Sequence, residues 1–146
     1  MIGTWTRLDH ALIDLMAAHG IRLLRIALAV TFIWFGALKI TGQSPVGDLV
    51  ASTVYWIPPA FFVPFLGVWE VVVGVGLLFG VALRAILLLF WLQMAGTFLI
   101  LVMHPDIAFQ AGNPLLLTTT GEFVIKNLVL ISAGIVIGST VPRTRA

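Results

Sequence analysis

The stretch GVWEVVVGVGLLFG, residues 67–80, is apolar at almost every position and carries a single carboxylate, Glu70. An ionised carboxylate in hydrocarbon is costly, so an acidic residue inside a membrane is expected to be paired, protonated, in contact with water or functional. The stretch therefore raises two questions: whether the surrounding chain spans a membrane, and what Glu70 contacts there.

The composition of the whole chain answers the first question. Of its 146 residues, 60% are hydrophobic and 10% are charged, and the mean hydropathy is +1.12. A soluble domain of this size carries about 25% charged residues, so we infer an integral membrane protein. The net charge of +2 gives no indication of nucleic-acid binding. The absence of cysteine excludes disulfides, iron–sulfur ligation and cysteine-type zinc sites.

Four segments are long and apolar enough to cross a bilayer, which takes about 20 residues per helix. They cover residues 23–40, 60–83, 85–103 and 123–141. The second and third segments nearly abut, so we expect a tight turn at residues 80–84. The sequence predicts an all-α integral membrane protein, with four transmembrane helices in an antiparallel bundle over residues 21–146.

Short helices are expected outside these spans. Residues 1–20 predict an amphipathic interfacial helix that ends at Gly20, because apolar residues recur at helical spacing: Trp5, Leu8, Leu12 and Leu15. Ser44 followed by Pro45 predicts the start of a short helix in the first loop. Thr119 and Glu122 have the spacing of a capping box for the fourth span.

The arginines are distributed asymmetrically. With four spans and an internal N-terminus, all six would lie on the cytoplasmic side, namely Arg7, Arg22, Arg25, Arg84, Arg143 and Arg145. The two outer loops would hold no lysine or arginine. The positive-inside rule therefore predicts a multi-pass protein of a bacterial-type cytoplasmic (inner) membrane with both termini cytoplasmic. No cleavable signal peptide is evident, and a retained signal anchor is expected.

Polar side chains within the spans are concentrated toward the outer side. At about 1.5 Å per helical residue, Glu70 and Gln93 fall near the midplane, and Lys39 and Lys126 fall nearer the outer surface. The outer rim would carry His104, Asp106 and Glu122. One hypothesis is that Lys39, Glu70, Gln93 and Lys126 line one pocket that binds a quinone head group, a small anion or a partner segment.

Structural explanations for the same residues remain open. Glu70 would then bond Gln93 or a lysine of another helix only to hold the helices together, and Lys39 would extend to water. Lys126 would pair with Glu122, four residues earlier on the same helix face. Close helix packing is expected at two small-residue motifs, Gly76-x-x-x-Gly80 and Gly134-x-x-x-Gly138.

The sequence shows no catalytic constellation. It has no phosphate-binding loop, no dinucleotide fingerprint and no nucleophile–base arrangement, and no His–carboxylate cluster has metal-ligand spacing. The histidines lie outside the predicted spans, which argues against a haem held by two membrane histidines. We therefore expect no metal and no stand-alone enzyme, and at most a membrane subunit of an oxidoreductase.

Three stretches resemble the DoxX-like family of four-helix membrane proteins, including its RclC-type reactive chlorine resistance branch. They are LLRIALAVTFIWFGALKITG (23–42), GVWEVVVGVGLLFGVALR (67–84) and GEFVIKNLVLISAG (121–134). The matching positions include Arg25, Gly36 and Lys39 in the first stretch. In the second they are Glu70, Gly74, Leu77, Leu78, Gly80 and Arg84. In the third they include Gly121 and Lys126.

This resemblance implies a four-helix membrane fold and an association with redox chemistry. The family takes its name from a subunit of a membrane thiosulfate:quinone oxidoreductase, and other members are linked to oxidative or chlorine stress. The longer outer loop of the reactive-chlorine branch is missing here, so a specific stress role does not carry over. The resemblance favours functional roles for Lys39, Glu70 and Lys126.

Three functions therefore remain. The leading hypothesis is a membrane subunit or accessory of a redox or oxidative-stress system, with quinone as the candidate cofactor and a membrane or redox subunit as partner. The first alternative is a small proton-coupled transporter with Glu70 as the proton site, which at this size is expected to form a homo-oligomer. The second is a scaffold or assembly factor without a ligand. In each case the lipid bilayer surrounds the chain.

Overall fold

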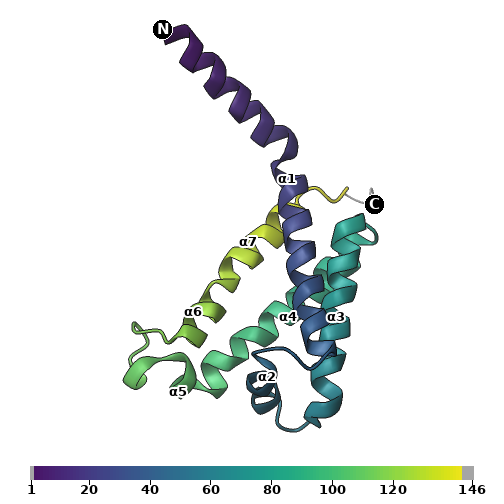
Figure 1. Ribbon diagram of the computed structural model, residues 1–146, viewed down its shortest axis with the longest axis vertical. Helices are drawn as coiled ribbons and strands as arrows, with labels where there is room; N and C mark the ends of the chain where they lie inside the picture. Colours follow the sequence, from purple (N-terminus) through teal and green to yellow (C-terminus); the bar gives the residue numbers. More distant parts are fainter. Residues whose placement is uncertain (1, 143–146) are drawn as a thin grey trace.

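The computed structural model describes residues 2–142, with side chains described from Trp5 onward, and is helical over most of that length (Figure 1). Four helical segments are long and apolar enough to cross a membrane. The predicted all-α, four-span architecture is thus confirmed. The elements, in chain order, are α1 (Ile2–Ile40), α2 (Gly47–Thr53), α3 (Pro59–Phe79), α4 (Leu83–Met103), α5 (Pro105–Ala108), the 3₁₀ helix η1 (Gln110–Gly112), α6 (Thr119–Ile125) and α7 (Asn127–Gly138).

The helix α1 is continuous through Gly20, so the predicted helix end at this glycine is wrong. The described glycines with a left-handed backbone are Gly42, Gly80 and Gly112, and Gly20 is not among them. A helix of 39 residues is about 58 Å long, nearly twice the hydrocarbon core. Its first half extends away from the other helices (Figure 1). The placement of residues 1–20 on the membrane surface remains a prediction.

The turn between α3 and α4 is as tight as expected, but it begins earlier than the predicted span end at residue 83. Gly80 has φ 69° and ends α3, and Ala82 has φ 48° directly before α4. A left-handed residue ends a helix because it turns the next N–H back onto the last carbonyls. Gly80 therefore serves as a helix cap rather than as the predicted packing residue, and it faces the Arg25 guanidinium.

The fourth span begins four residues before the predicted position 123. The hydroxyl oxygen of Thr118 accepts a hydrogen bond from the Gly121 N–H at 3.1 Å, so the cap lies one residue before Thr119. The span comprises α6 and α7, which meet at Lys126, whose backbone remains helical. In the first loop α2 begins at Gly47, and no side chain caps it, so the predicted Ser44 cap is wrong.

Two close approaches of glycine set the helix packing. A Cβ on Gly36 of α1 would lie 2.5 Å from the Gly67 carbonyl oxygen of α3, and one on Gly67 would lie 2.7 Å from the Gly36 carbonyl oxygen. Glycine at both positions lets the two backbones touch. Of the predicted packing glycines, Gly76 lies against Ile86 and Gly134 against Phe90, whereas Gly138 makes only an ordinary contact.

Both ends of the described chain lie at the same end of the bundle as the turn between α3 and α4 (Figure 1). The apolar core lies between α1, α3, α4 and α7 and includes Phe32, Val73, Leu77, Phe90 and Ile137. At the opposite end, α2 and α5 cover the ends of the long helices (Figure 1). Of the polar residues predicted within the spans, Lys39, Glu70 and Gln93 are buried, whereas the side chain of Lys126 is exposed.

Candidate functional site

Glu70 and Lys39 form a buried ion pair between α3 and α1. The Lys39 ammonium lies 2.7 Å and 2.9 Å from the two carboxylate oxygens of Glu70. Lys39 is 5% exposed and Glu70 is 6% exposed. The expectation that Glu70 is paired is confirmed, whereas the alternative in which Lys39 extends to water is wrong. Lys39 lies in the last turn of α1, where the helix dipole favours a cation.

The glycine contact explains why these two charges meet. Lys39 lies three residues after Gly36 on α1, and Glu70 lies three residues after Gly67 on α3. A Cβ on Gly36 would lie 2.9 Å from the Glu70 Cβ, and one on Gly67 would lie 2.9 Å from the Lys39 Cβ. Each glycine thus leaves room for the charged residue of the opposite helix. The repeated Gly-x-x-charge spacing is a sequence signal for this contact.

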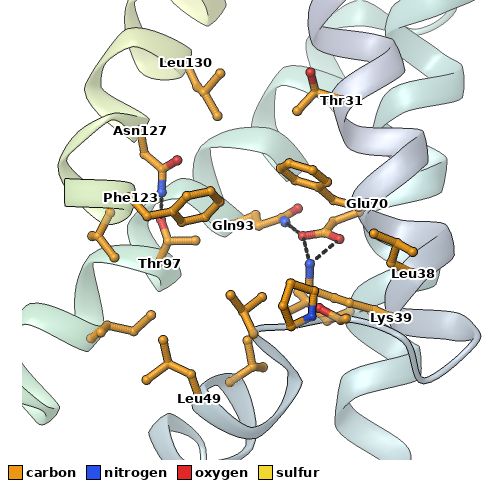
Figure 2. Close-up of a pocket in the computed structure, with 18 of the residues that line it drawn as sticks. Thr31, Leu38, Lys39, Leu49, Glu70, Gln93, Thr97, Phe123, Asn127 and Leu130 are labelled. Atoms are coloured by element: carbon orange, nitrogen blue, oxygen red, sulfur yellow. Dashed lines mark hydrogen bonds and ion pairs between the residues drawn. The ribbon is translucent and has the colours of Figure 1, made fainter. Parts of the chain in front are cut away.

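Gln93 of α4 completes the polar cluster, which we define as Lys39, Glu70 and Gln93. Its side-chain Nε2 donates to Glu70 Oε1 at 2.5 Å (Figure 2). Glu70 therefore receives donors from two other helices, which compensates part of the cost of removing a carboxylate from water. The Oε1 of Gln93 is buried and has no hydrogen-bond partner among the described residues.

The polar cluster lies in the wall of a cavity of about 360 Å³. Most of the lining side chains are apolar, and they belong to the four spans and to α2 with the loop before it. The lining residues are Thr31, Phe32, Phe35, Leu38 and Lys39 of α1; Ser44, Pro45, Val46, Leu49 and Val50 in and before α2; Leu66 and Glu70 of α3; Gln93, Met94, Thr97 and Ile100 of α4; and Thr119, Thr120, Phe123, Val124, Asn127 and Leu130 of the fourth span.

Four residues of the predicted site lie elsewhere. Lys126 does not line this cavity; its side chain is 73% exposed and lies 3.6 Å from the Glu122 carboxylate, as the structural alternative had it. Asp106 is exposed in the short helix α5. The backbone of His104 ends α4 and caps α5, and its Nε2 is buried without a partner among the described residues. The structure therefore separates these groups from Glu70.

The structure adds two polar residues that the sequence analysis did not identify, Asn127 and Thr97. Asn127 is 8% exposed, lines the cavity, and donates from Nδ2 to the Thr97 hydroxyl at 3.3 Å (Figure 2). Asn127 is the first residue of α7 and follows Lys126, which drew attention because it is charged. An uncharged amide inside an apolar segment is a weaker signal, although burying it is also costly without partners.

The volume and the lining of the cavity are those of small-molecule sites in other proteins. Ligand sites of roughly 300–1,000 Å³ with apolar walls and a few convergent polar groups are typical of proteins. An ammonium carries three donors, so Lys39 retains capacity for an oxygen atom of a ligand beyond the Glu70 carboxylate. The described residues contain no group of three or more His, Cys, Asp or Glu side chains that could hold a metal ion.

Comparison with known proteins identifies the family. Searches of curated proteins and of solved structures returned no match for this chain. A family model described as DoxX matches residues 20–105, more than half of the chain, including Lys39, Glu70 and Gln93. The matched region ends before the fourth span, where Asn127 lies. The chain is thus a multi-pass membrane protein that belongs to the DoxX family.

Proposed function

We propose that the cavity binds a lipid-soluble ligand of the quinone class, and that the protein serves as a membrane subunit or accessory of a redox or oxidative-stress system. The observation that carries this proposal is the position of the polar cluster in the wall of an otherwise apolar cavity. An amphipathic ring would fill the apolar volume and place an oxygen atom at the Lys39 ammonium.

The proposed orientation places the cavity toward the outer face of a bacterial-type inner membrane, with both termini cytoplasmic. Arg25 lies against Gly80, and Arg84 donates to the Pro142 carbonyl, so both arginines belong to the end of the bundle that carries the chain ends. Arginine-rich ends stay on the cytoplasmic side. Arg143 and Arg145, which contribute to the same prediction, lie outside the described residues.

The two alternative functions make different use of Glu70. A proton-coupled transporter needs this carboxylate to gain and lose a proton, which would change its two contacts with Lys39 and its one contact with Gln93. A scaffold needs the polar cluster only as a connection between helices. A scaffold would bind no ligand in the cavity beside the cluster. A measurement of ligand binding therefore distinguishes the scaffold from the leading proposal.

The test is equilibrium binding of duroquinone, in its oxidised and reduced forms, to the full-length protein in lipid nanodiscs. We expect saturable binding of at least one form at one site per chain. Leu49→Trp fills the cavity from α2 and is expected to weaken binding by about tenfold or more. Ser52→Trp adds the same indole to an exposed position of α2 that does not line the cavity, and is expected to leave binding unchanged.

Two results would contradict the proposal. The first is that nanodiscs with and without the protein take up the same amount of duroquinone and of duroquinol. The second is saturable binding that Leu49→Trp and Ser52→Trp reduce equally, because the ligand would then occupy some other place. Melting temperatures of both variants within a few degrees of the parent show that the comparison is made on folded protein.

A further inference from the structure

Two buried amide side chains border the cavity from different helices, and each has a carbonyl oxygen that accepts no hydrogen bond from the described part of the chain. Gln93 belongs to α4 and Asn127 to α7, and each is 8% exposed. The carbonyl oxygen of Gln93 is itself buried, and a buried acceptor without a partner costs stability that a donor supplied by a ligand would restore. The orientation of each amide therefore indicates which chemical groups the cavity selects.

The orientation of Gln93 is determined by Glu70. A carboxylate ion only accepts hydrogen bonds, so the group that Gln93 presents to Glu70 Oε1 must be its NH₂. Rotating the amide by 180° would place two oxygen atoms in contact and leave a buried negative charge with one donor fewer. The carbonyl oxygen of Gln93 is thus held on the side away from Glu70, without a partner.

The orientation of Asn127 follows from Thr97 by the same reasoning. The Thr97 hydroxyl donates its one proton to the Met94 carbonyl at 2.8 Å, so toward Asn127 it can only accept. The group of Asn127 that faces Thr97 is therefore the NH₂. Its carbonyl oxygen is turned away from Thr97 and receives no donor from the described side chains.

The two amides lie on different sides of the pocket. Figure 2 shows Gln93 beside Glu70 and Lys39, and Asn127 of α7 beside Thr97 of α4, with the Phe123 ring between the two groups. Both amides line the cavity. The wall of the cavity therefore has two polar regions, each with one amide side chain, and an apolar surface between them.

We propose that this cavity selects the reduced, hydroxyl-bearing form of its ligand: an apolar ring with two hydroxyl groups, of the hydroquinone class, rather than the corresponding dione. This inference rests on the proposed function and specifies the ligand class of the same site. A hydroxyl group both donates and accepts, so one ligand oxygen can donate to Gln93 and accept from Lys39. A quinone carbonyl only accepts, and would leave both amide oxygens without donors.

Selectivity of this kind is strong where the unpaired acceptor is buried, as the carbonyl oxygen of Gln93 is. A site built to hydrogen-bond a hydroxyl group discriminates well against an analogue that lacks it, since the polar groups of the protein then remain unpaired. We expect the reduced ligand to bind about tenfold tighter or more. For a two-electron pair, a tenfold preference raises the midpoint potential of the bound ligand by about 30 mV.

The experiment compares duroquinol with duroquinone, which share one ring and four methyl groups and differ by two hydrogen atoms. Dissociation constants are measured anaerobically on the full-length protein in nanodiscs. The parent is expected to favour duroquinol about tenfold or more. Gln93→Met and Asn127→Leu each remove one acceptor and are expected to reduce this ratio, each mainly by weakening duroquinol binding.

Gln43→Met is the matched control, because Gln43 is exposed and does not line the cavity. Its ratio of the dissociation constants for duroquinone and duroquinol should equal that of the parent. If Gln93→Met does not fold, Asn127→Leu tests the same inference from the other side of the cavity. Equal affinities for the two forms, or tighter binding of duroquinone, would overturn the selection of hydroxyl groups while leaving the proposed ligand site in place. Failure of both forms to bind saturably would remove the proposed function as well.

Discussion

At the scale of single residues, burying the Glu70 carboxylate costs free energy because the charge loses its contact with water, and its neighbours reduce that cost. Lys39 supplies a counter-charge and Gln93 a further donor. A buried ion pair contributes little net stability compared with apolar residues of the same shape, but removing one partner leaves the other charge unpaired. The stability of the protein should therefore depend on keeping or losing the pair as a unit.

This dependence gives a prediction for Lys39. Lys39→Met leaves Glu70 buried without a counter-charge and is expected to destabilise the protein by about 3–5 kcal/mol. Lys39→Met combined with Glu70→Gln removes both charges and should recover most of that loss. The measurement is reversible unfolding of four proteins in mixed micelles, as a double-mutant cycle: the parent, Lys39→Met, Glu70→Gln and the double variant.

The exposed pair of Glu122 and Lys126 is the control for this cycle. Lys126→Met interrupts a pair whose side chains are largely exposed, and such pairs contribute about 0–1 kcal/mol. Equal losses for Lys39→Met and Lys126→Met, or a double variant that loses the full sum of its two single changes, would show that the buried pair is not a coupled unit.

The residue scale is also where prediction from the sequence was incomplete. The cost of a lone charge in apolar sequence correctly predicted that Glu70 needs a partner. Depth along a helix could not decide between Lys39 and Lys126, because depth says nothing about the direction in which a side chain points. That direction depends on helix rotation, which the contact of Gly36 with Gly67 fixes for α1 and α3.

At the scale of helices, the contact between α1 and α3 positions the ion pair. Gly67→Ala would place a methyl group 2.7 Å from the Gly36 carbonyl oxygen and 2.9 Å from the Lys39 Cβ. Overpacking of this kind costs about 1–3 kcal/mol or more. We predict that Gly67→Ala lowers stability by that amount and also weakens duroquinol binding, because the displaced helices carry Lys39 and Glu70.

Gly96→Ala is the matched control, since a Cβ on Gly96 of α4 would meet no atom within 4 Å. Alanine is a better helix former than glycine by about 1 kcal/mol, so this variant should be as stable as the parent or more stable. Equal free energies of unfolding for Gly67→Ala and Gly96→Ala would contradict the close contact of α1 with α3.

The helices themselves were largely predictable, and their ends were less so. Hydropathy locates all four spans because a run of about 20 mostly apolar residues is long enough to cross the bilayer as a helix. The ends depend on single backbone conformations that composition does not fix. Gly80 adopts the left-handed conformation and ends α3, whereas Gly20, also a glycine, continues α1 as an ordinary helical residue.

At the scale of the whole molecule, one end of the bundle is closed by apolar packing and the other holds the cavity. The core residues occupy the side toward the chain ends, and α2 folds back over the opposite side, where Leu49 and Val50 line the cavity. The α1 helix ends at Ile40, and Gly42, with a φ of 71°, turns the chain back toward the bundle. The loop between the first two spans thus forms part of the cavity wall.

The whole-molecule arrangement could be predicted only in part. The asymmetry of the arginines and the count of four spans predict which ends lie together. The return of α2 over the helices could not be predicted, because a seven-residue helix has too few residues for its apolar face to specify a partner. Asn127 was missed for a related reason, since its role depends on Thr97 from another helix.

The most direct test of the central claim, that this cavity holds a quinone-class ligand, is the identification of what the protein carries from native membranes. Organic extracts of the purified parent, Leu49→Trp and Ser52→Trp are compared by mass spectrometry, with the ligand quantified per chain. We predict a quinone or hydroquinone near one per chain in the parent and in Ser52→Trp, and its loss from Leu49→Trp. Equal amounts in all three proteins, or no enrichment over the bulk lipid in the parent, would contradict the account.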